Sequence, residues 1–144
     1  MALLAEAQTG HGVNGLCLIA AAASVALPLQ GFTLAWMHSI EKIRWEEDYR
    51  IVGDRLELTE ARIRGSGAGM EPPEGAVLRD GAWHYRPDLP ALERLQLVRS
   101  SYVRDYELCW DGACRPLATI LGPVESAPMV EVSACAIDNA NRTR

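Results

Sequence analysis

Apolar and polar side chains alternate along two consecutive segments in the first half of the chain. Over Phe32–Ile40, every second residue is large and apolar except His38, which holds a place in the same series. Over Ile43–Ile51, apolar residues alternate with charged ones, and Glu47 stands in the middle of the apolar series. A period of two residues is typical of a β-strand, whose successive side chains point to opposite faces of the sheet. The pattern therefore predicts two strands, each with one polar residue on its apolar face.

Short apolar runs separated by turn signals continue through the rest of the chain. Asp80-Gly81 and Asp111-Gly112 are each typical of a two-residue hairpin turn, in which both central residues take positive φ. The other segments predicted as strands are 16–21, 25–29, 55–63, the hairpin 76–85, 92–98, 102–110, 113–121 and 129–136. No long helix is predicted. About ten short strands are typical of an all-β fold, so we expect a single-domain antiparallel β-sandwich or partly open barrel.

The two ends of the chain show no periodicity. We therefore expect the β domain to cover residues 15–136, with 1–14 as a loosely ordered leader and 137–144 as a frayed tail. At 144 residues, the chain has the length of one domain with its own core.

The apolar segment near the N-terminus also resembles a signal peptide or a membrane helix in composition. No Lys or Arg precedes Lys42, which argues against a signal peptide. Pro28 and Gly31 interrupt the run short of the roughly 20 apolar residues that span a bilayer. We therefore expect two strands here and no transmembrane helix. The absence of a targeting signal predicts a cytoplasmic protein, with the periplasm as the alternative.

Charge narrows the classes of partner. The formal net charge is −5, whereas nucleic acids and anionic lipid favour basic surfaces. We therefore do not expect nucleic-acid binding. Four arginines lie close together in the sequence, but acidic residues interleave them, which predicts a solvated face of mixed charge. They are Arg50, Arg55, Arg62 and Arg64.

His38 and Glu47 are the unusual residues of the first predicted hairpin. A turn at Lys42–Ile43 would place them directly opposite each other, with Cβ atoms about 5 Å apart. A loop longer by an even number of residues would change the partner but keep both residues on one face. A buried carboxylate needs a partner, and an imidazole supplies an N–H or a positive charge. The pair either fixes the strand register or forms, with Glu41, the floor of a pocket for a metal ion, a proton or a small polar ligand.

Residues 65–75, GSGAGMEPPEG, predict an irregular loop. The loop lacks the lysine of a P-loop and the spacing of a dinucleotide fingerprint, so we do not expect a nucleotide site. Gly65, Gly67 and Gly69 favour positive φ or close backbone approach. Together with Ser66, such a loop could close over the His38 end of the sheet and present amide donors to an anion.

The chain contains four cysteines. The Asp111-Gly112 turn places Cys109 opposite Cys114, where a disulfide is feasible. The absence of an export signal favours two reduced thiols instead. Cys17 and Cys135 lie on the first and last predicted strands and are candidates for a second neighbouring pair. The spacing does not match a zinc site, and no catalytic motif is present, so we expect no metal, no cofactor and no assigned catalytic residue.

Three segments together resemble the domain-of-unknown-function 1850 family of small bacterial proteins. They are FTLAWMHSIEKIRWEEDYRI, LELTEARIRGSGAGMEPPEGAVLRDG and CWDGACRPL, the last followed by the late Cys135. Within them, the segments that carry the resemblance are His38-Ser39-x-Glu41, Trp45-x-Glu47 and Gly65–Pro72. The resemblance implies a compact β-rich domain and no established catalytic activity. It also implies an association with TRAP-type transporters of the TAXI class, which take up organic acids.

We therefore expect a non-enzymatic accessory or binding module, with subunits of a TAXI-type TRAP transporter and a small organic anion as its partners. The alternative is a small metal- or carboxylate-handling enzyme in which His38 acts as acid or base and Glu47 orients it. The candidate ligand-binding residues are His38, Ser39, Glu41, Glu47, Gly65, Ser66, Gly67 and Gly69.

Overall fold

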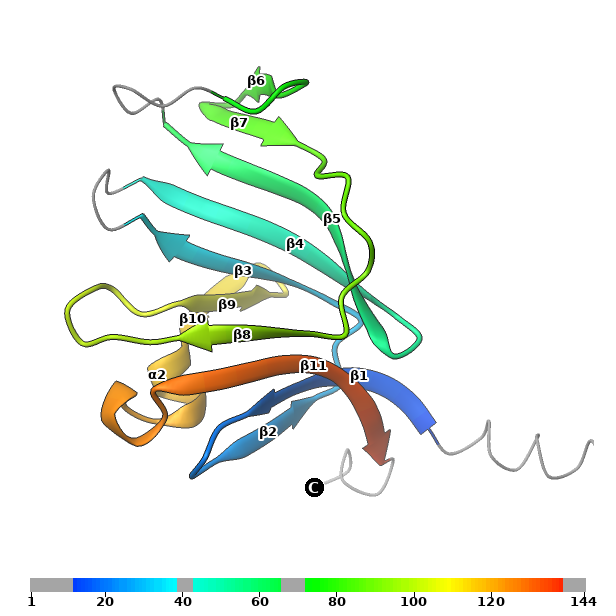
Figure 1. The fold of residues 1–144 in the computed structure, drawn as a ribbon, viewed down its shortest axis with the longest axis vertical. Helices are drawn as coiled ribbons and strands as arrows, with labels where there is room; N and C mark the ends of the chain where they lie inside the picture. The colour runs from blue at the N-terminus through cyan, green and yellow to red at the C-terminus, as the bar shows by residue number, and fades with distance from the viewer. Residues whose placement is uncertain (1–11, 39–42, 66–71, 139–144) are drawn as a thin grey trace, which may run out of the picture.

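The computed structural model describes residues 12–38, 43–65 and 72–138 of the chain. Within these ranges, eleven strands form two antiparallel sheets, accompanied by one short α-helix and no closed barrel (Figure 1). The predicted all-β antiparallel fold is therefore confirmed. No helix in the described ranges is long and apolar enough to cross a bilayer.

The larger sheet has seven strands in the order β10-β9-β3-β4-β5-β7-β6. These strands are β3 (Gly31–Met37), β4 (Arg44–Val52), β5 (Arg55–Arg64), β6 (Val77–Arg79), β7 (Ala82–Tyr85), β9 (Glu107–Trp110) and β10 (Ala113–Pro116). Asp80 and Asp111 have φ values of 53° and 52°, and the glycine after each also has positive φ. Both predicted hairpin turns are thus confirmed.

The smaller sheet has four strands in the order β2-β1-β11-β8. They are β1 (Gly12–Ile19), β2 (Ser24–Leu27), β8 (Arg94–Val98) and β11 (Met129–Asp138). The first and last strands of the chain therefore lie side by side, and a disulfide joins Cys17 to Cys135 across them. Strand structure extends into the residues expected as leader and tail, and the remainder of both lies outside the described ranges.

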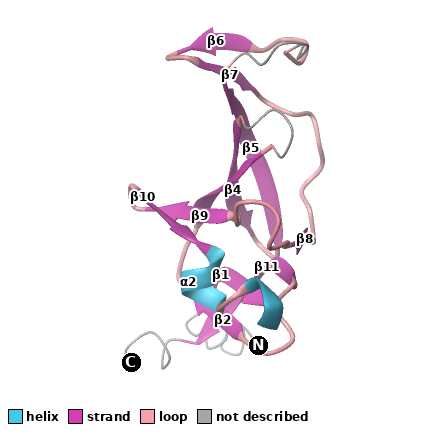
Figure 2. Cartoon of the chain, turned by 90° about the vertical axis from the view of Figure 1, so that its left-hand side faces the viewer, coloured by secondary structure: helices cyan, strands magenta, loops and turns pink. Residues whose placement is uncertain are grey.

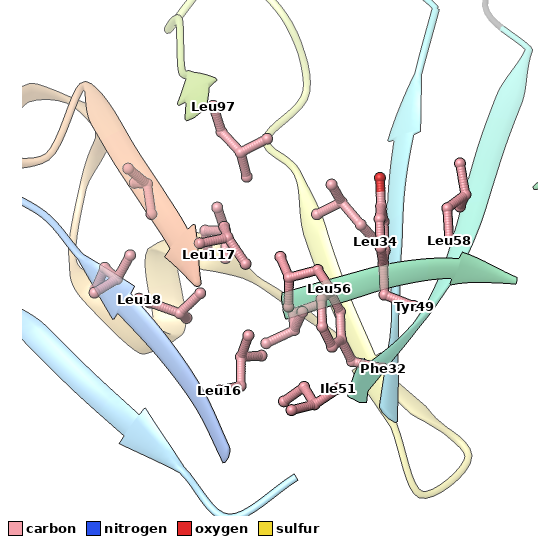
Figure 3. Close-up of a cluster of buried hydrophobic side chains, with 14 residues drawn as sticks. Leu16, Leu18, Phe32, Leu34, Tyr49, Ile51, Leu56, Leu58, Leu97 and Leu117 are labelled. Atoms are coloured by element: carbon pink, nitrogen blue, oxygen red, sulfur yellow. The ribbon is translucent and has the colours of Figure 1, made fainter. Parts of the chain in front are cut away.

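The core lies between the two sheets (Figure 3). Leucine and valine side chains of β1 and β11 pack against apolar side chains of β3, β4 and β5. The buried residues of this core are Leu16, Leu18, Phe32, Leu34, Tyr49, Ile51, Leu56, Leu58, Leu97, Leu108, Leu117, Leu121, Val130 and Val132. Burying one such side chain stabilises a fold by about 1.5–3 kcal/mol, so this cluster holds the sheets together.

The seven-stranded sheet extends beyond the four-stranded one. Figures 1 and 2 show β6, β7 and the adjoining part of β5 standing clear of β1, β2 and β11. We call the face that packs on the four-stranded sheet the inner face, and the opposite one the outer face. Among the described strands, the four-stranded sheet therefore covers only part of this inner face.

The register of β3 and β4 differs from the predicted one. Phe32 lies opposite Tyr49 with ring centroids 5.3 Å apart, and Trp36 lies opposite Trp45 at 6.2 Å. Aromatic pairs directly opposite each other stabilise a sheet, which accounts for the observed register. The alternation alone did not distinguish it from the predicted one.

The prediction that His38 lies opposite Glu47 is consequently wrong. Glu47 lies opposite Leu34, and the backbone N–H of His38 donates to the carbonyl oxygen of Ile43 at 2.8 Å. The shift is an even number of residues, so His38 and Glu47 do share the inner face, as the His38 ring stacked 6.0 Å from Trp45 confirms.

A short helix replaces part of a predicted strand. The segment 113–121 was expected to be extended, but β10 ends at Pro116 and α2 (Leu117–Leu121) follows. Leu117 and Leu121 are four residues apart, so they lie on one side of the helix, and both are buried in the core. The 3₁₀ turn η1 (Val124–Ser126) then leads to β11.

A buried arginine shapes the connection before β9. The side chain of Arg99 is 0% exposed and donates two hydrogen bonds of 2.9 Å to the carboxylate of Asp105. It also donates to the carbonyl oxygens of Ala127 and Gly122, each at 3.0 Å. Because these bonds hold residues 99–105 in a loop, β9 begins only at Glu107 and not at the predicted residue 102.

Candidate functional site

A row of aromatic side chains crosses the inner face of the seven-stranded sheet. Trp36 lies opposite Trp45, Trp45 opposite Ile63, and Ile63 opposite Trp83, on four neighbouring strands. At one end of the row, the ring centroid of Tyr106 lies 6.2 Å from that of Trp36. We call this surface the inner aromatic face; its residues are Trp36, His38, Trp45, Glu47, Ile63, Trp83, Tyr85 and Tyr106.

Glu47 supplies the negative charge of this face. Glu47 lies opposite Ala61, and Ala61 lies opposite Tyr85 on the next strand. Because Ala61 has a small side chain, the side chains of Glu47 and Tyr85 both extend beyond it. The hydroxyl of Tyr49 donates to Glu47 Oε1 at 2.7 Å. Burial and then the Glu47 charge raise the pKa of the Tyr85 phenol above its ordinary value. A carboxylate among phenols and indoles suits a partner that brings a hydrogen-bond donor or a positive charge.

The inner aromatic face has two parts. Trp36 and Tyr106 pack against the main core, whereas Trp45, Trp83 and Tyr85 lie beyond it and are half-buried. The indole Nε1 of Trp45 is buried without a hydrogen-bond partner in the described part of the chain. An unpaired buried donor costs about 1–3 kcal/mol. Packing of the main core therefore does not account for the position of Trp45.

A second candidate site lies on the outer face and was missed by the sequence analysis. Leu58 and Ala61 both point inward although an odd number of positions separates them. Thr59 is an extra residue in β5, because Tyr49 pairs with Leu58 while Asp48 already pairs with Glu60. This β-bulge moves the following charged residues to the outer face. The change of apolar spacing between Leu58 and Ala61 is the signal that would have revealed it.

Three arginines converge on Glu46 on this face. The Nε atoms of Arg44, Arg62 and Arg64 donate to its carboxylate at 2.8, 2.9 and 3.0 Å. Glu46 is only 8% exposed. Burial works to raise its pKa, but the hydrogen bonds from Arg44 and Arg62 and the nearby charges outweigh burial and hold the pKa below its ordinary value. Glu46 therefore stays ionised at neutral pH.

Arg62 continues the cluster along β4 and β5. Its two Nη atoms donate to the carboxylate of Asp48, each at 2.7 Å, and Nη1 also donates to Glu60 at 2.8 Å. The hydroxyl of Thr33 donates to Asp48 at 2.6 Å. The two hydrogen bonds from Arg62 to Asp48 make a two-pronged ion pair, which is the strong form of this interaction. We name the set the outer ion cluster; it consists of Thr33, Arg44, Glu46, Asp48, Glu60, Arg62, Arg64, His84 and Glu107.

The predicted solvated face of mixed charge is thus only partly confirmed. Arg50 and Arg55 are exposed, but the Arg62 side chain is 14% exposed and fully engaged by carboxylates. The bulge places Arg62 among these carboxylates, where its side chain is largely buried.

A disulfide joins Cys109 to Cys114 at the edge of the outer ion cluster. The two cysteines lie directly opposite each other in β9 and β10, as the turn predicted. The expectation of two reduced thiols is not met in the structure. Arg44 Nη2 lies 3.5 Å from Cys114 Sγ and 3.9 Å from Cys109 Sγ, because its other nitrogens are held by Glu46 and Glu107.

An open pocket of about 550 Å³ lies beside this disulfide on the outer face. Thr33, Asp48 and Arg64 line one side, and Cys109 and Cys114 line the other. The Arg64 side chain is 45% exposed and donates to Glu46 through Nε. The pocket therefore combines a partly accessible guanidinium with an accessible disulfide.

Few of the predicted ligand-binding residues fall in the described ranges. Ser39, Glu41, Ser66, Gly67 and Gly69 lie outside them.

His38 follows the end of β3 and Gly65 follows the end of β5, which places both at one end of the sheet. Gly65 has φ of 104°, as its residue type predicted, and donates its N–H to the carbonyl oxygen of Gly81 at 3.2 Å. Among the described residues, no group of His, Cys, Asp and Glu side chains is arranged to hold a metal ion.

Comparisons with known proteins identify the family. No curated protein and no solved structure matches this chain. A family model described as Domain of unknown function (DUF1850) matches residues 32–117, which span the seven-stranded sheet from the second residue of β3 to the first residue of α2. The match contains every residue of the inner aromatic face and of the outer ion cluster. The chain therefore belongs to the DUF1850 family, as the resemblance of its sequence segments predicted.

Proposed function

We propose that this protein is a non-enzymatic binding module and that the inner aromatic face is its docking surface. The observation that carries the proposal is that Trp45, Trp83 and Tyr85 lie beyond the main core on the inner face and are only half-buried within the described part of the chain. Tryptophan and tyrosine at an accessible surface dominate the binding energy of protein interfaces.

The enzyme alternative loses its main support in this arrangement. Acid–base chemistry by His38 and Glu47 requires the two side chains within hydrogen-bond reach. The Trp36–Trp45 pair lies between them in the strand register, and the Glu47 carboxylate accepts a hydrogen bond from Tyr49 instead. Glu47 fits better as a polar anchor inside an aromatic docking surface.

The partner we propose is a subunit of a TAXI-type TRAP transporter, on the resemblance of the sequence. The two disulfides support a location outside the cytoplasm, because disulfides persist in oxidising compartments. The cytoplasmic location expected from the N-terminal sequence stays a prediction, and we propose the periplasmic alternative.

Binding to the intact transporter, reconstituted in nanodiscs, tests this proposal. The Trp83→Ala variant is expected to weaken binding by about 2 kcal/mol, roughly 30-fold in Kd, because it removes an aromatic anchor. Met129→Ala is the control, since Met129 is 55% exposed and lies on β11 of the four-stranded sheet. Thermal unfolding of each variant shows whether it remains folded.

Two results would contradict the proposal. Folded Trp83→Ala that binds as tightly as the wild type would exclude the inner aromatic face as the docking surface. Wild-type protein that shows no binding to the intact transporter would exclude the proposed partner.

A small organic anion is a second candidate ligand, favoured by Arg64 in the outer pocket. The Nε atom of Arg64 is held by Glu46, while the side chain is 45% exposed and lines the pocket. Planar two-pronged recognition of a carboxylate is a property of arginine. A thermal-shift titration with dicarboxylates should raise Tm for the wild type and not for Arg64→Gln. An equal rise in Tm in the wild type and in Arg64→Gln would exclude Arg64 as the binding site of such an anion.

A further inference from the structure

The Cys109–Cys114 disulfide differs from the Cys17–Cys135 disulfide in its surroundings. Cys114 is exposed and both sulfurs line the outer pocket, so a thiol can reach them. Arg44 Nη2 lies 3.5 Å from Cys114 Sγ and 3.9 Å from Cys109 Sγ. Cys17 and Cys135 are half-buried, and within the described ranges no guanidinium contacts either sulfur.

The contact between Arg44 and the two sulfurs stabilises the oxidised and the reduced states to different extents. A disulfide sulfur is a weak hydrogen-bond acceptor, so the contact contributes little in the oxidised protein. A thiolate beside a guanidinium is a charge-assisted pair, and positive charge favours the thiolate form of cysteine. Arg44 therefore stabilises the reduced state more than the oxidised state, which makes the disulfide more easily reduced.

The position of Arg44 is fixed by carboxylates and not by the sulfurs. Its Nε donates to Glu46 at 2.8 Å and its Nη1 donates to Glu107, and the side chain is 26% exposed. The remaining Nη2 is thereby directed at the two sulfurs. The charge is in place before reduction occurs, so no rearrangement is needed to stabilise a thiolate.

We propose that Cys109–Cys114 is a redox-active disulfide that exchanges with thiols entering the outer pocket, and that Arg44 stabilises the thiolate it releases. An incoming thiolate attacks Cys114 Sγ, forms a mixed disulfide with it, and breaks the Sγ–Sγ bond. The electron pair leaves on Cys109 Sγ as a thiolate beside Arg44. A second thiolate attacks the sulfur of the incoming group, forms a disulfide with it, and releases Cys114 as a thiolate. The protein gains two electrons, and the two thiols are oxidised to one disulfide.

Equilibration in glutathione buffers of graded ratio tests the proposal on the whole protein. The four cysteines are trapped with acid, alkylated and quantified by mass spectrometry after digestion. Cys109–Cys114 is expected to have a reduction equilibrium constant at least about tenfold larger than that of Cys17–Cys135. Equal constants for the two disulfides would overturn the proposal. A parallel series with reduced thioredoxin shows whether a protein dithiol enters the pocket as glutathione does.

Variants of Arg44 separate its charge from simple exposure of the disulfide. Arg44→Gln is expected to lower the constant for Cys109–Cys114 about tenfold, while Arg44→Lys, which keeps the charge, retains most of it. A variant that only loosens the fold would instead make both disulfides easier to reduce, which would raise both reduction constants. The Cys17–Cys135 constant, measured in the same sample, shows whether such loosening has occurred. An unchanged Cys109–Cys114 constant in Arg44→Gln would overturn the role of Arg44.

Discussion

Glu46 shows how one residue can organise a charged sheet face. Its carboxylate is nearly buried, yet hydrogen bonds from Arg44, Arg62 and Arg64 satisfy it. Taking a carboxylate out of water is expensive unless it is paired and hydrogen-bonded. The residue therefore stabilises the outer face only as long as its arginine partners are present.

Replacing Glu46 by Gln should lower the free energy of unfolding by about 2 kcal/mol, because three guanidinium groups lose their shared charged partner. Glu57→Gln is the matched control, since the Arg50–Glu57 pair on the same hairpin is 63% and 38% exposed. The control should cost less than about 1 kcal/mol. Chemical denaturation measures both, and equal losses would contradict the importance assigned to Glu46.

The outer ion cluster also predicts an acid-labile fold. For Glu46, Asp48 and Glu60, burial works to raise the pKa, but hydrogen bonds from arginine outweigh it and the pKa is lowered. A carboxylate with a lowered pKa in the folded state contributes stability that is present above its unfolded pKa and is lost as pH falls through the folded one. Stability measured by denaturation should therefore fall below about pH 4. A flat profile in that range would be inconsistent with the cluster.

At the scale of single elements, the bulge in β5 decides which charges meet. Leu56 and Leu58 face inward before Thr59, and Ala61 and Ile63 face inward after it. Strict alternation from Leu58 onward would have turned Arg62 inward. The extra residue is satisfied locally, since the Thr59 hydroxyl donates to the carbonyl oxygen of Asp48 at 3.2 Å.

Deleting Thr59 should leave a folded protein, because the remaining residues then form a regular strand with the same inward and outward positions. Deleting Glu57 shortens the strand equally but turns Leu58, a core residue only 8% exposed, to the outer face. The second deletion should cost about 2–3 kcal/mol more. Denaturation curves of the two variants check this, and a more stable Glu57 deletion would show that the bulge assignment is incorrect.

The elements that could be predicted are those whose pattern has a single physical solution. Alternation fixed the strands of the first hairpin, and Asp-Gly fixed two turns, because only positive φ closes a two-residue turn. The β3–β4 register was not determined, since several even offsets keep Glu47 and His38 on one face. Helix α2 was missed because five residues carry too little periodicity to compete with a strand.

At the scale of the molecule, the chain closes on itself through β1 and β11. The Cys17–Cys135 disulfide joins residues 118 positions apart, whereas Cys109–Cys114 joins residues 5 positions apart. The sequence predicted that Cys109 and Cys114 lie opposite each other, and it left Cys17 and Cys135 as candidates for a second pair. It favoured reduced thiols for Cys109 and Cys114, because redox state depends on the compartment and no export signal was found. The inner aromatic face was likewise only partly predictable, since Trp83 and Tyr85 reach it through sheet pairing distant in the sequence.

The two disulfides should therefore differ in their effect on stability. Replacing Cys17 and Cys135 by Ser should cost about 4–5 kcal/mol, and replacing Cys109 and Cys114 by Ser about 2 kcal/mol, because the longer loop restricts the unfolded chain more. Denaturation of the two double variants under non-reducing conditions measures the difference. A larger loss from the Cys109 and Cys114 variant would contradict this account.

The most direct test of the proposed function is photo-crosslinking to the transporter. A photoreactive benzoylphenylalanine in place of Trp83 reports on the inner aromatic face, and the same group in place of Met129, which is 55% exposed on the four-stranded sheet, reports on a different surface. Our account predicts that the transporter subunit is captured from position 83 and not from position 129. Capture from position 129 alone would contradict it.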